Sequence, residues 1–204
     1  GIDINAIIQT CSNNEHLPPN EIVRRSTKKI RKLSYRSLKE YSQENTIKTL
    51  KLQQGKLYFY SLIKKNAGFE PYLETIAHKQ HRQALTRLRL SAHFLPIEKG
   101  RHLGIPREKR YCILCNTQEI GSEIHILSQC KNSIMQRWRN EMVTAAITHN
   151  HELVKLSPAD QIIYLTLGHD SSTSALMGKY SYDTLELHEL PWHMRGRGAV
   201  AYLS

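Results

Sequence analysis

Three of the four cysteines in this chain lie close together in the sequence, with a histidine among them. The segment CILCNTQEIGSEIHILSQC, residues 112–130, has the spacing C-x2-C-x9-H-x4-C. Two cysteines separated by two residues can direct both sulfurs at one point, and thiolates together with imidazole are ligands that suit zinc. The spacing predicts one zinc ion bound by Cys112, Cys115, His125 and Cys130.

Four protein ligands would complete a tetrahedral shell around this ion and leave no metal-bound water for chemistry. We therefore predict a structural zinc site and a non-catalytic chain. Two other interpretations of the cluster remain open: buried side chains without a metal, and a disulfide between Cys112 and Cys115. Because residues five apart point about 140° apart on an α-helix, we expect His125 early in a short helical turn and Cys130 just beyond its end.

The charge of the chain is strongly positive and unevenly distributed, with 29 lysines and arginines against 18 acidic residues, a net charge of +11. Residues 21–65 carry +10 and residues 66–140 carry +6, whereas residues 1–20 and 141–204 are slightly acidic. This distribution indicates a polyanionic partner for the front two-thirds of the chain, foremost nucleic acid, with acidic lipid or protein surfaces as alternatives.

The sequence also bears on where the protein is found. No run of eighteen apolar residues occurs, so no membrane span is predicted. The first residues show no signal-peptide pattern, and the cysteines are too few for a disulfide scaffold. We expect an intracellular protein with reduced thiols, located in the nucleus.

The segments on either side of the cysteine–histidine cluster, which must hold these residues in place, have sequence patterns typical of helices. Asn20 followed by Glu21 is typical of a helix start, and a basic amphipathic helix is predicted over residues 20–52. A short helix is predicted over residues 56–69, ended by Gly68, with a strand as the alternative because short apolar runs are ambiguous.

Further along the chain, an apolar stripe predicts a helix over residues 72–92, and residues 94–110, with two prolines and two glycines, read as an extended connector. Two more helices are predicted over residues 132–149 and 158–168. Residues 169–204 show no clear period and are predicted to be loosely ordered.

These patterns predict a mainly α protein with three regions. A basic helical region spans residues 1–66, and a helical domain spans residues 67–168. This domain includes a small zinc knuckle, residues 112–130, built from a short hairpin and a short helix. Residues 169–204 are predicted to form an irregular C-terminal tail.

The segment RQALTRLRLSAHFLPIEKGRHLGIPREKRYCILC, followed by EIHILSQC, resembles the region near the C-terminus of reverse transcriptases encoded by LINE-type non-LTR retrotransposons. In that family the sequence contains, in order, the motifs ALTRLR, GR, IPR and R-C-x-x-C, and these are followed by the motif E-x-H-x-L-x-x-C. The resemblance covers about residues 80–131. It implies a CCHC zinc knuckle that lies downstream of the polymerase and engages RNA or DNA, with the same four residues as ligands. No Y-x-D-D polymerase signature occurs in this chain.

The charge and the resemblance together predict a zinc-stabilised nucleic-acid-binding module that contacts mainly the RNA or DNA backbone. It would be part of a retrotransposon-type reverse transcriptase or the product of a gene derived from one. Alternatives are a protein-interaction module, whose basic helix docks on an acidic partner, and a nuclease-related domain suggested by the HNH letters at 149–151. The candidate nucleic-acid-binding residues are Arg25, Lys29, Lys32, Arg36, Arg82, Arg87, Arg89, Arg101, Arg107 and Arg110.

Overall fold

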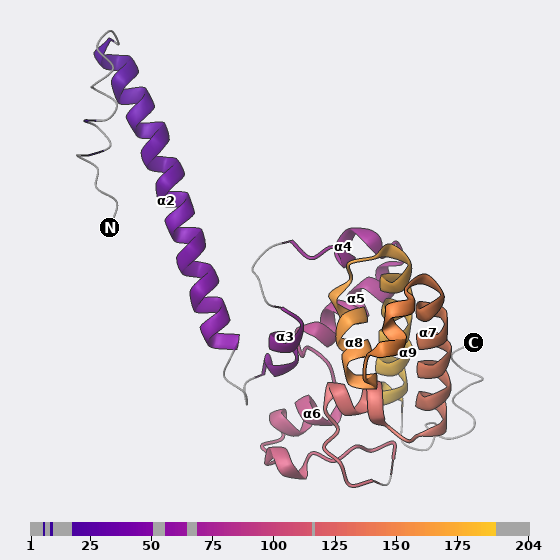
Figure 1. Ribbon diagram of the computed structural model, residues 1–204. Coiled ribbons are helices and arrows are strands. Elements are labelled where there is room, and N and C mark those ends of the chain that lie inside the picture. Colours follow the sequence, from indigo (N-terminus) through magenta and orange to yellow (C-terminus); the bar gives the residue numbers. More distant parts are fainter. Residues whose placement is uncertain are drawn as a thin grey trace. The chain divides into compact units, whose positions relative to one another are not determined.

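The computed structural model describes residues 6, 9, 18–50, 56–64, 69–115 and 117–190, and these residues are mostly helical (Figure 1). No β-strand occurs in these ranges, and one isolated antiparallel bridge joins Tyr111 to Ile120. The prediction of a mainly α protein is confirmed. None of the described helices combines the length and the apolar character needed to cross a lipid bilayer.

The chain divides into two compact units, Gly1–Thr49 and Leu50–Ser204. The first unit is dominated by helix α2, Pro19–Leu50, close to its predicted bounds. Glu21 lies in the first turn and accepts hydrogen bonds from Arg24 at 2.8 Å and Arg25 at 2.9 Å, which lower the pKa of Glu21 to about 2. An acid near the N-terminus of a helix and pairs three or four residues apart both favour helix formation.

The second unit is built from short and medium helices. Its α-helices are α3 (Tyr58–Ile63), α4 (Tyr72–Thr75), α5 (Lys79–Arg89), α6 (Pro96–His102), α7 (Ser133–His149), α8 (Pro158–Leu167) and α9 (Ser171–Glu189). Two 3-10 turns, η1 (Arg107–Lys109) and η3 (His151–Lys155), and one π-helical turn, η2 (His125–Gln129), complete it.

The core of the second unit lies where α9 packs against both α5 and α7, and α8 packs against α3, α9 and η2 (Figure 1). Apolar side chains from all these elements are removed from water, which is the main stabilising contribution to such a domain. The fully buried ones include Leu85, Leu88, Ile126, Leu127, Met135, Ile162, Met177 and Leu187.

The predicted irregular tail is wrong for most of its length, because Ser171–Glu189 form α9, the longest described helix of the second unit. Asp170 caps it by accepting a hydrogen bond from the backbone of Thr173 at 2.8 Å. The helix packs against neighbours through small buried residues as well as large ones, so it shows no single apolar stripe. Residues 191–204 lie outside the described part of the chain.

The predicted boundary after residue 66 is also wrong. Phe59 and Ile63 of α3 are buried in the core of the second unit, so this helix belongs with the domain that follows rather than with the basic helix. The helix predicted over residues 56–69 is confirmed only over Tyr58–Ile63, and Gly68 lies outside the described residues.

Two further predictions need correction. The single helix expected over residues 72–92 is two, α4 and α5, because Ile76 has an extended backbone and ends the first. The connector expected over residues 94–110 contains α6 and η1, since Pro96 stands at the first helical position, where its fixed φ favours a helix.

Two glycines in the left-handed conformation give a matched test of packing in this domain. Gly168 ends α8 with φ 72°, and a Cβ added there would lie 2.7 Å from the Cβ of Tyr72. Gly104 has φ 68° and nothing within 4 Å of such a Cβ. We expect Gly104→Ala to lower the free energy of unfolding by about 1–2 kcal/mol through backbone strain alone. Gly168→Ala should lose roughly 1–3 kcal/mol more through overpacking. Urea denaturation of both variants measures the difference, and equal losses would contradict the role assigned to the Tyr72 contact.

Candidate metal centre

The four predicted ligands meet at one point of the second unit. Their donor atoms all lie within 4.8 Å of one another, and all four residues are buried. Within the cluster, the sulfurs of Cys112 and Cys130 are 3.8 Å apart, and the sulfur of Cys115 lies 3.3 Å from Nε2 of His125. A tetrahedral ion with bonds of about 2.3 Å to sulfur and 2.0–2.1 Å to nitrogen separates its donors by roughly 3.6–3.8 Å. The donor atoms are therefore close enough together to hold one metal ion.

The three cysteines of the cluster are free thiols, so the alternative of a disulfide between Cys112 and Cys115 is wrong. Both lie in a loop that two backbone hydrogen bonds close. The amide of Cys112 donates to the carbonyl of Glu119, and the amide of Gly121 donates to the carbonyl of Arg110, each at 2.8 Å. This pairing places the Cys112–Cys115 pair near the return segment that carries the other two ligands.

His125 begins the π-helical turn η2 and Cys130 follows its end, as expected for a short helical turn. The amide of Cys130 donates to the carbonyl of His125 at 2.7 Å, the i to i+5 bond of a π-helix. This wider turn brings residues five apart toward the same side, whereas an α-helix would point them apart. The π-turn is the local feature that joins the second pair of ligands to the first.

Glu119 orients the histidine of the cluster. Its carboxylate accepts a hydrogen bond from Nδ1 of His125 at 2.6 Å, which leaves Nε2 facing the sulfur of Cys115. A carboxylate behind a ligating histidine fixes the ring and makes it a stronger ligand. The sequence analysis did not identify Glu119, although an acid in the loop between the second and third ligands was a usable signal.

Hydrogen bonds within the cluster shift the pKa values of its side chains. The hydrogen bond from the thiol of Cys130, helped by His125 and backbone amides, lowers the pKa of Cys112 to about 3. The hydrogen bond to Cys112 is likewise the largest cause that raises the pKa of His125, to about 9, while Cys112 and burial raise the pKa of Cys130. Because metal ligands must be deprotonated, metal binding here would release protons.

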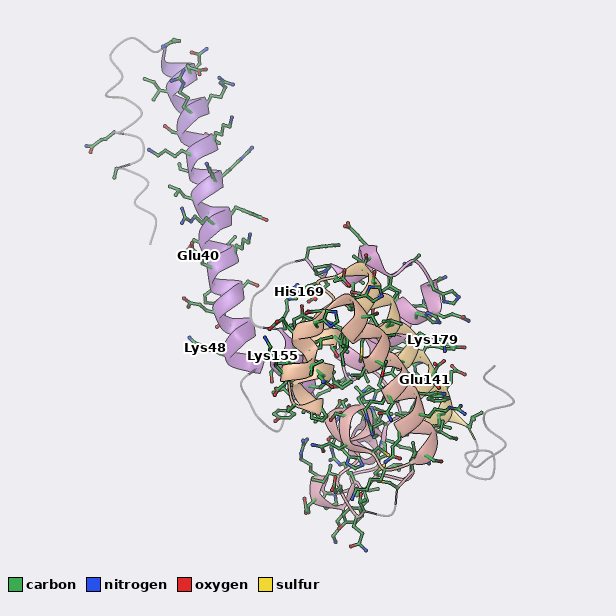
Figure 2. The ribbon with its side chains drawn as sticks, turned by 45° about the vertical axis from the view of Figure 1, so that its right-hand side comes forward. Glu40, Lys48, Glu141, Lys155, His169 and Lys179 are labelled. Atoms are coloured by element: carbon green, nitrogen blue, oxygen red, sulfur yellow. The ribbon has the colours of Figure 1, made fainter. Side chains whose placement is uncertain are left out.

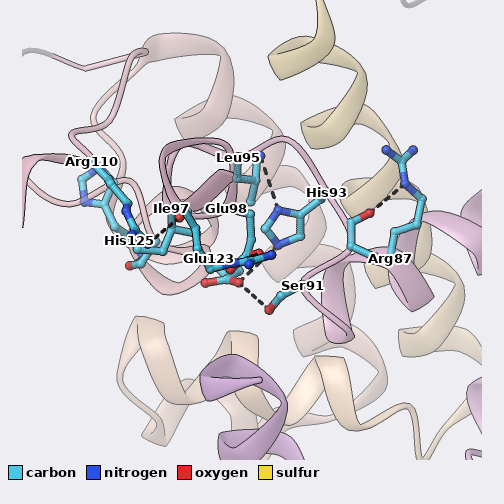
Figure 3. A network of polar contacts seen from close by, with 12 residues as sticks. Arg87, Ser91, His93, Leu95, Ile97, Glu98, Arg110, Glu123 and His125 are labelled. Carbon is cyan, nitrogen blue, oxygen red and sulfur yellow. Dashed lines mark hydrogen bonds and ion pairs between the residues drawn. The ribbon is translucent and has the colours of Figure 1, made fainter. Parts of the chain in front are cut away.

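A buried polar network ties the cluster segment to the connection between α5 and α6 (Figure 3). The hydroxyl of Ser91 and Nε2 of His93 donate to the same carboxylate oxygen of Glu123, at 3.0 and 3.2 Å. The amide of Leu95 donates to Nδ1 of His93 at 3.3 Å, so the ring proton lies on Nε2. Burial would raise the pKa of Glu123, but the contacts with His93 and Ser91 outweigh it and the pKa is lowered. Glu123 is two residues from His125, so the network positions the start of the π-turn.

No protein-family model, curated protein or solved structure matches the chain.

The basic residues predicted to bind nucleic acid differ in accessibility between the two units. Arg25, Lys29, Lys32 and Arg36 are exposed on α2. In the second unit Arg89 is only 1% exposed: its guanidinium binds the carboxylate of Glu70 and the carbonyl of Thr166. The assignment of Arg89 to nucleic-acid binding is wrong, because its donors are already used inside the domain.

Several other arginines of the second unit hold backbone in place. Three of them are half-buried and donate to main-chain carbonyls. Arg82 donates to the carbonyl of Ile76 at 2.6 Å, and Arg87 donates to that of Ala92 at 3.2 Å. Arg110 donates to the carbonyls of Ile97 at 3.0 Å and Ile105 at 2.8 Å. Arg101 pairs with Glu98 at 2.9 Å, and the guanidinium of Arg107 lies 5.5 Å from the ring centre of Tyr58. The arginines that carry the family resemblance thus have structural contacts in this domain.

Proposed function

We propose that the protein is a zinc-stabilised nucleic-acid-binding module of non-catalytic type. It would derive from the C-terminal region of a LINE-type reverse transcriptase and act in the nucleus. The observation that carries the proposal is the meeting of Cys112, Cys115, His125 and Cys130 within 4.8 Å in a chain of net charge +11.

Zinc is the metal that this donor set suits best. Three thiolates and one imidazole are soft to intermediate ligands in a tetrahedral arrangement, which favours zinc over the oxygen-seeking cations. All four positions are taken by protein atoms, so zinc would stabilise the loop and would not activate water. The ion with three thiolates and one neutral imidazole would carry a net charge of −1, and phosphate must bind elsewhere.

The exposed cations of α2 are the best candidates for that binding. Lysine and arginine side chains neutralise phosphates and release counterions, which gives affinity without sequence preference. In the second unit most of the predicted arginines are engaged in the fold, so we assign phosphate contact chiefly to Arg25, Lys29, Lys32 and Arg36 on α2.

An electrophoretic titration of the zinc-loaded protein with single-stranded RNA, duplex DNA and heparin tests this function. We expect binding to nucleic acid whose logarithmic affinity falls linearly with the logarithm of salt concentration, by about 0.7–0.9 per phosphate contacted. Full competition by heparin with no preference for nucleic acid would contradict the proposal. A response to salt that is flat would instead favour a protein-interaction module with a structural zinc site.

The role assigned to Glu119 gives a further prediction for the zinc centre. Glu119→Ala should leave the four ligands in place but remove the acceptor of His125 Nδ1, and we expect zinc affinity to fall about 10–100-fold. Glu108→Ala removes an exposed acid from the neighbouring segment and serves as the control. Competition with a fluorescent zinc chelator measures both affinities, and equal affinities would refute the orienting role.

A further inference from the structure

The basic residues in the first two-thirds of α2 lie on one half of the helix, whereas Lys48 in its last turn lies on the other half. With an advance of about 100° per residue, all the lysines and arginines between Pro19 and Lys39 fall within roughly 160° of arc. The only acid in this arc, within α2, is Glu21 in the first turn. The eight basic residues of this arc, called here the basic arc, are Arg24, Arg25, Lys28, Lys29, Arg31, Lys32, Arg36 and Lys39.

The basic arc has two flanks and a centre. Arg24 and Arg31 lie along one flank, and Lys29 and Arg36 lie along the other, about 140° away. Lys28, Lys32 and Lys39 lie nearest the centre, and Tyr35, which is 71% exposed, lies about 40° from it toward the Arg24 flank. The arc therefore presents positive charge across its whole width, over about 22 Å of helix.

The charge of the basic arc is largely uncompensated. All eight basic side chains are exposed, and the side chains of α2 stand out from the helix along its whole length (Figure 2). In the part of the chain that the structure describes, three of the eight have an ion pair: Arg24 and Arg25 with Glu21, and Arg36 with Glu40. The remaining cations are available to a polyanion.

We infer that α2 lies in the major groove of duplex DNA, an inference that rests on the nucleic-acid-binding function proposed above. A helix with its side chains is about 10–12 Å across, and the major groove of B-form DNA is about 12 Å wide. A helix in this groove has a phosphate backbone on each side and base edges below. The two flanks of the basic arc match the two backbones, and Lys28 and Lys39 at its centre face the bases.

Other polyanions fit the basic arc less well. The major groove of A-form RNA is deep and narrow and does not admit a helix. Single strands are held by a series of aromatic side chains, and Tyr35 is the one aromatic residue in the arc. Helices that lie in a membrane surface bury bulky apolar residues opposite the charges. The opposite half of α2 carries the bulky residues Ile22, Val23, Ile30, Leu33, Leu38 and Tyr41, but Ser26, Ser34 and Ser37 interrupt them, so it forms no continuous apolar face.

The test uses the zinc-loaded full chain and two flank variants. One is Lys29→Gln/Lys32→Gln/Arg36→Gln, and the other is Arg24→Gln/Arg31→Gln. Glutamine is a good helix former, and far-ultraviolet circular dichroism checks that α2 persists. The matched control removes three exposed lysines of the second unit: Lys99→Gln/Lys109→Gln/Lys131→Gln. Each protein is titrated at several salt concentrations with a 20-base-pair DNA duplex, the corresponding RNA duplex, single-stranded DNA and phosphatidylserine vesicles.

We expect the wild type to prefer duplex DNA about tenfold or more over the other probes. Each flank variant should reduce the magnitude of the salt slope on DNA by about 0.9 for every cation removed, while the control keeps the wild-type slope. Equal binding to duplex RNA or single strands, binding to vesicles alone, or a loss confined to one flank would overturn the groove assignment. Nucleic-acid binding that does not depend on the α2 charges would overturn this inference and the assignment of phosphate contact to α2, while the chain would still be a nucleic-acid-binding module. Absence of any nucleic-acid binding by the wild type would overturn both.

Discussion

Replacing Cys115 with serine is expected to abolish zinc binding and to unfold the loop over residues 105–124, with a loss of roughly 5 kcal/mol or more. A serine hydroxyl does not replace a thiolate as a zinc ligand, so the tetrahedral shell would lose one corner. The surrounding loop has little core of its own, because Leu103, Tyr111 and Ile113 are exposed. The metal should therefore contribute most of the free energy that orders this segment.

Zinc content by elemental analysis and amide hydrogen exchange across residues 105–124 measure this effect. Cys11→Ser is the matched control: it changes the one cysteine outside the cluster, at a position that lies beyond the described residues. A strong chelator added to the wild type should reproduce the Cys115→Ser exchange pattern. Retention of zinc and of exchange protection in Cys115→Ser would contradict the assignment of Cys115 as a ligand.

Arg89→Met is expected to lower the free energy of unfolding by about 3–5 kcal/mol. The arginine binds Glu70 and the carbonyl of Thr166, and its guanidinium lies 4.7 Å from the ring centre of Tyr72. Its removal leaves a partly buried carboxylate with Lys64 as its remaining cation, at 2.6 Å. Breaking one side of a buried ion pair costs more than the pair itself is worth, because the other charge stays in place.

Arg87→Met provides the control on the same helix. Arg87 pairs with Glu189 at 2.6 Å, but both side chains are more than a third exposed, and such pairs contribute about 0–1 kcal/mol. Urea denaturation should rank Arg89→Met far below Arg87→Met in stability, and the double variant Arg89→Met/Glu70→Gln should recover part of the loss by removing the stranded charge. Similar stabilities of the two single variants would disprove the structural role of Arg89.

The same contacts predict a dependence of stability on acid. Burial would raise the pKa of Glu70, but the hydrogen bond from Lys64 and the charge of Arg89 outweigh it, and the pKa is lowered below its usual 4.5. The stabilisation by Glu70 is therefore fully present above about pH 4.5 and is lost as pH falls through the folded-state pKa. Glu70→Gln should flatten this part of the stability profile, which denaturation at several pH values measures.

The metal centre could be predicted from the sequence because its chemistry is local. Two cysteines three positions apart and a histidine and cysteine five positions apart define the ligands with little reference to the rest of the fold. The π-turn that joins His125 and Cys130, and the hydrogen bond from His125 to Glu119, could not be predicted in the same way. They depend on how the loop closes in space.

The sequence was less informative where burial decides the outcome. α9 was missed because Ser181 and Thr184 are as buried as its apolar residues, so the helix has no simple apolar period. Arg89 was assigned to the surface because a charged residue at helical spacing normally faces water. Its partners, Glu70 and Thr166, are 19 and 77 positions away in the chain, and only the folded structure brings them together.

The central claim is that three thiolates and one imidazole hold a single zinc ion. X-ray absorption at the zinc edge, combined with elemental analysis of the purified chain, tests this claim most directly. We predict one zinc per chain, with three sulfur neighbours at about 2.3 Å and one nitrogen neighbour at about 2.0–2.1 Å. A chain that binds no zinc, or a zinc ion surrounded by oxygen with fewer than three sulfurs, would contradict the account.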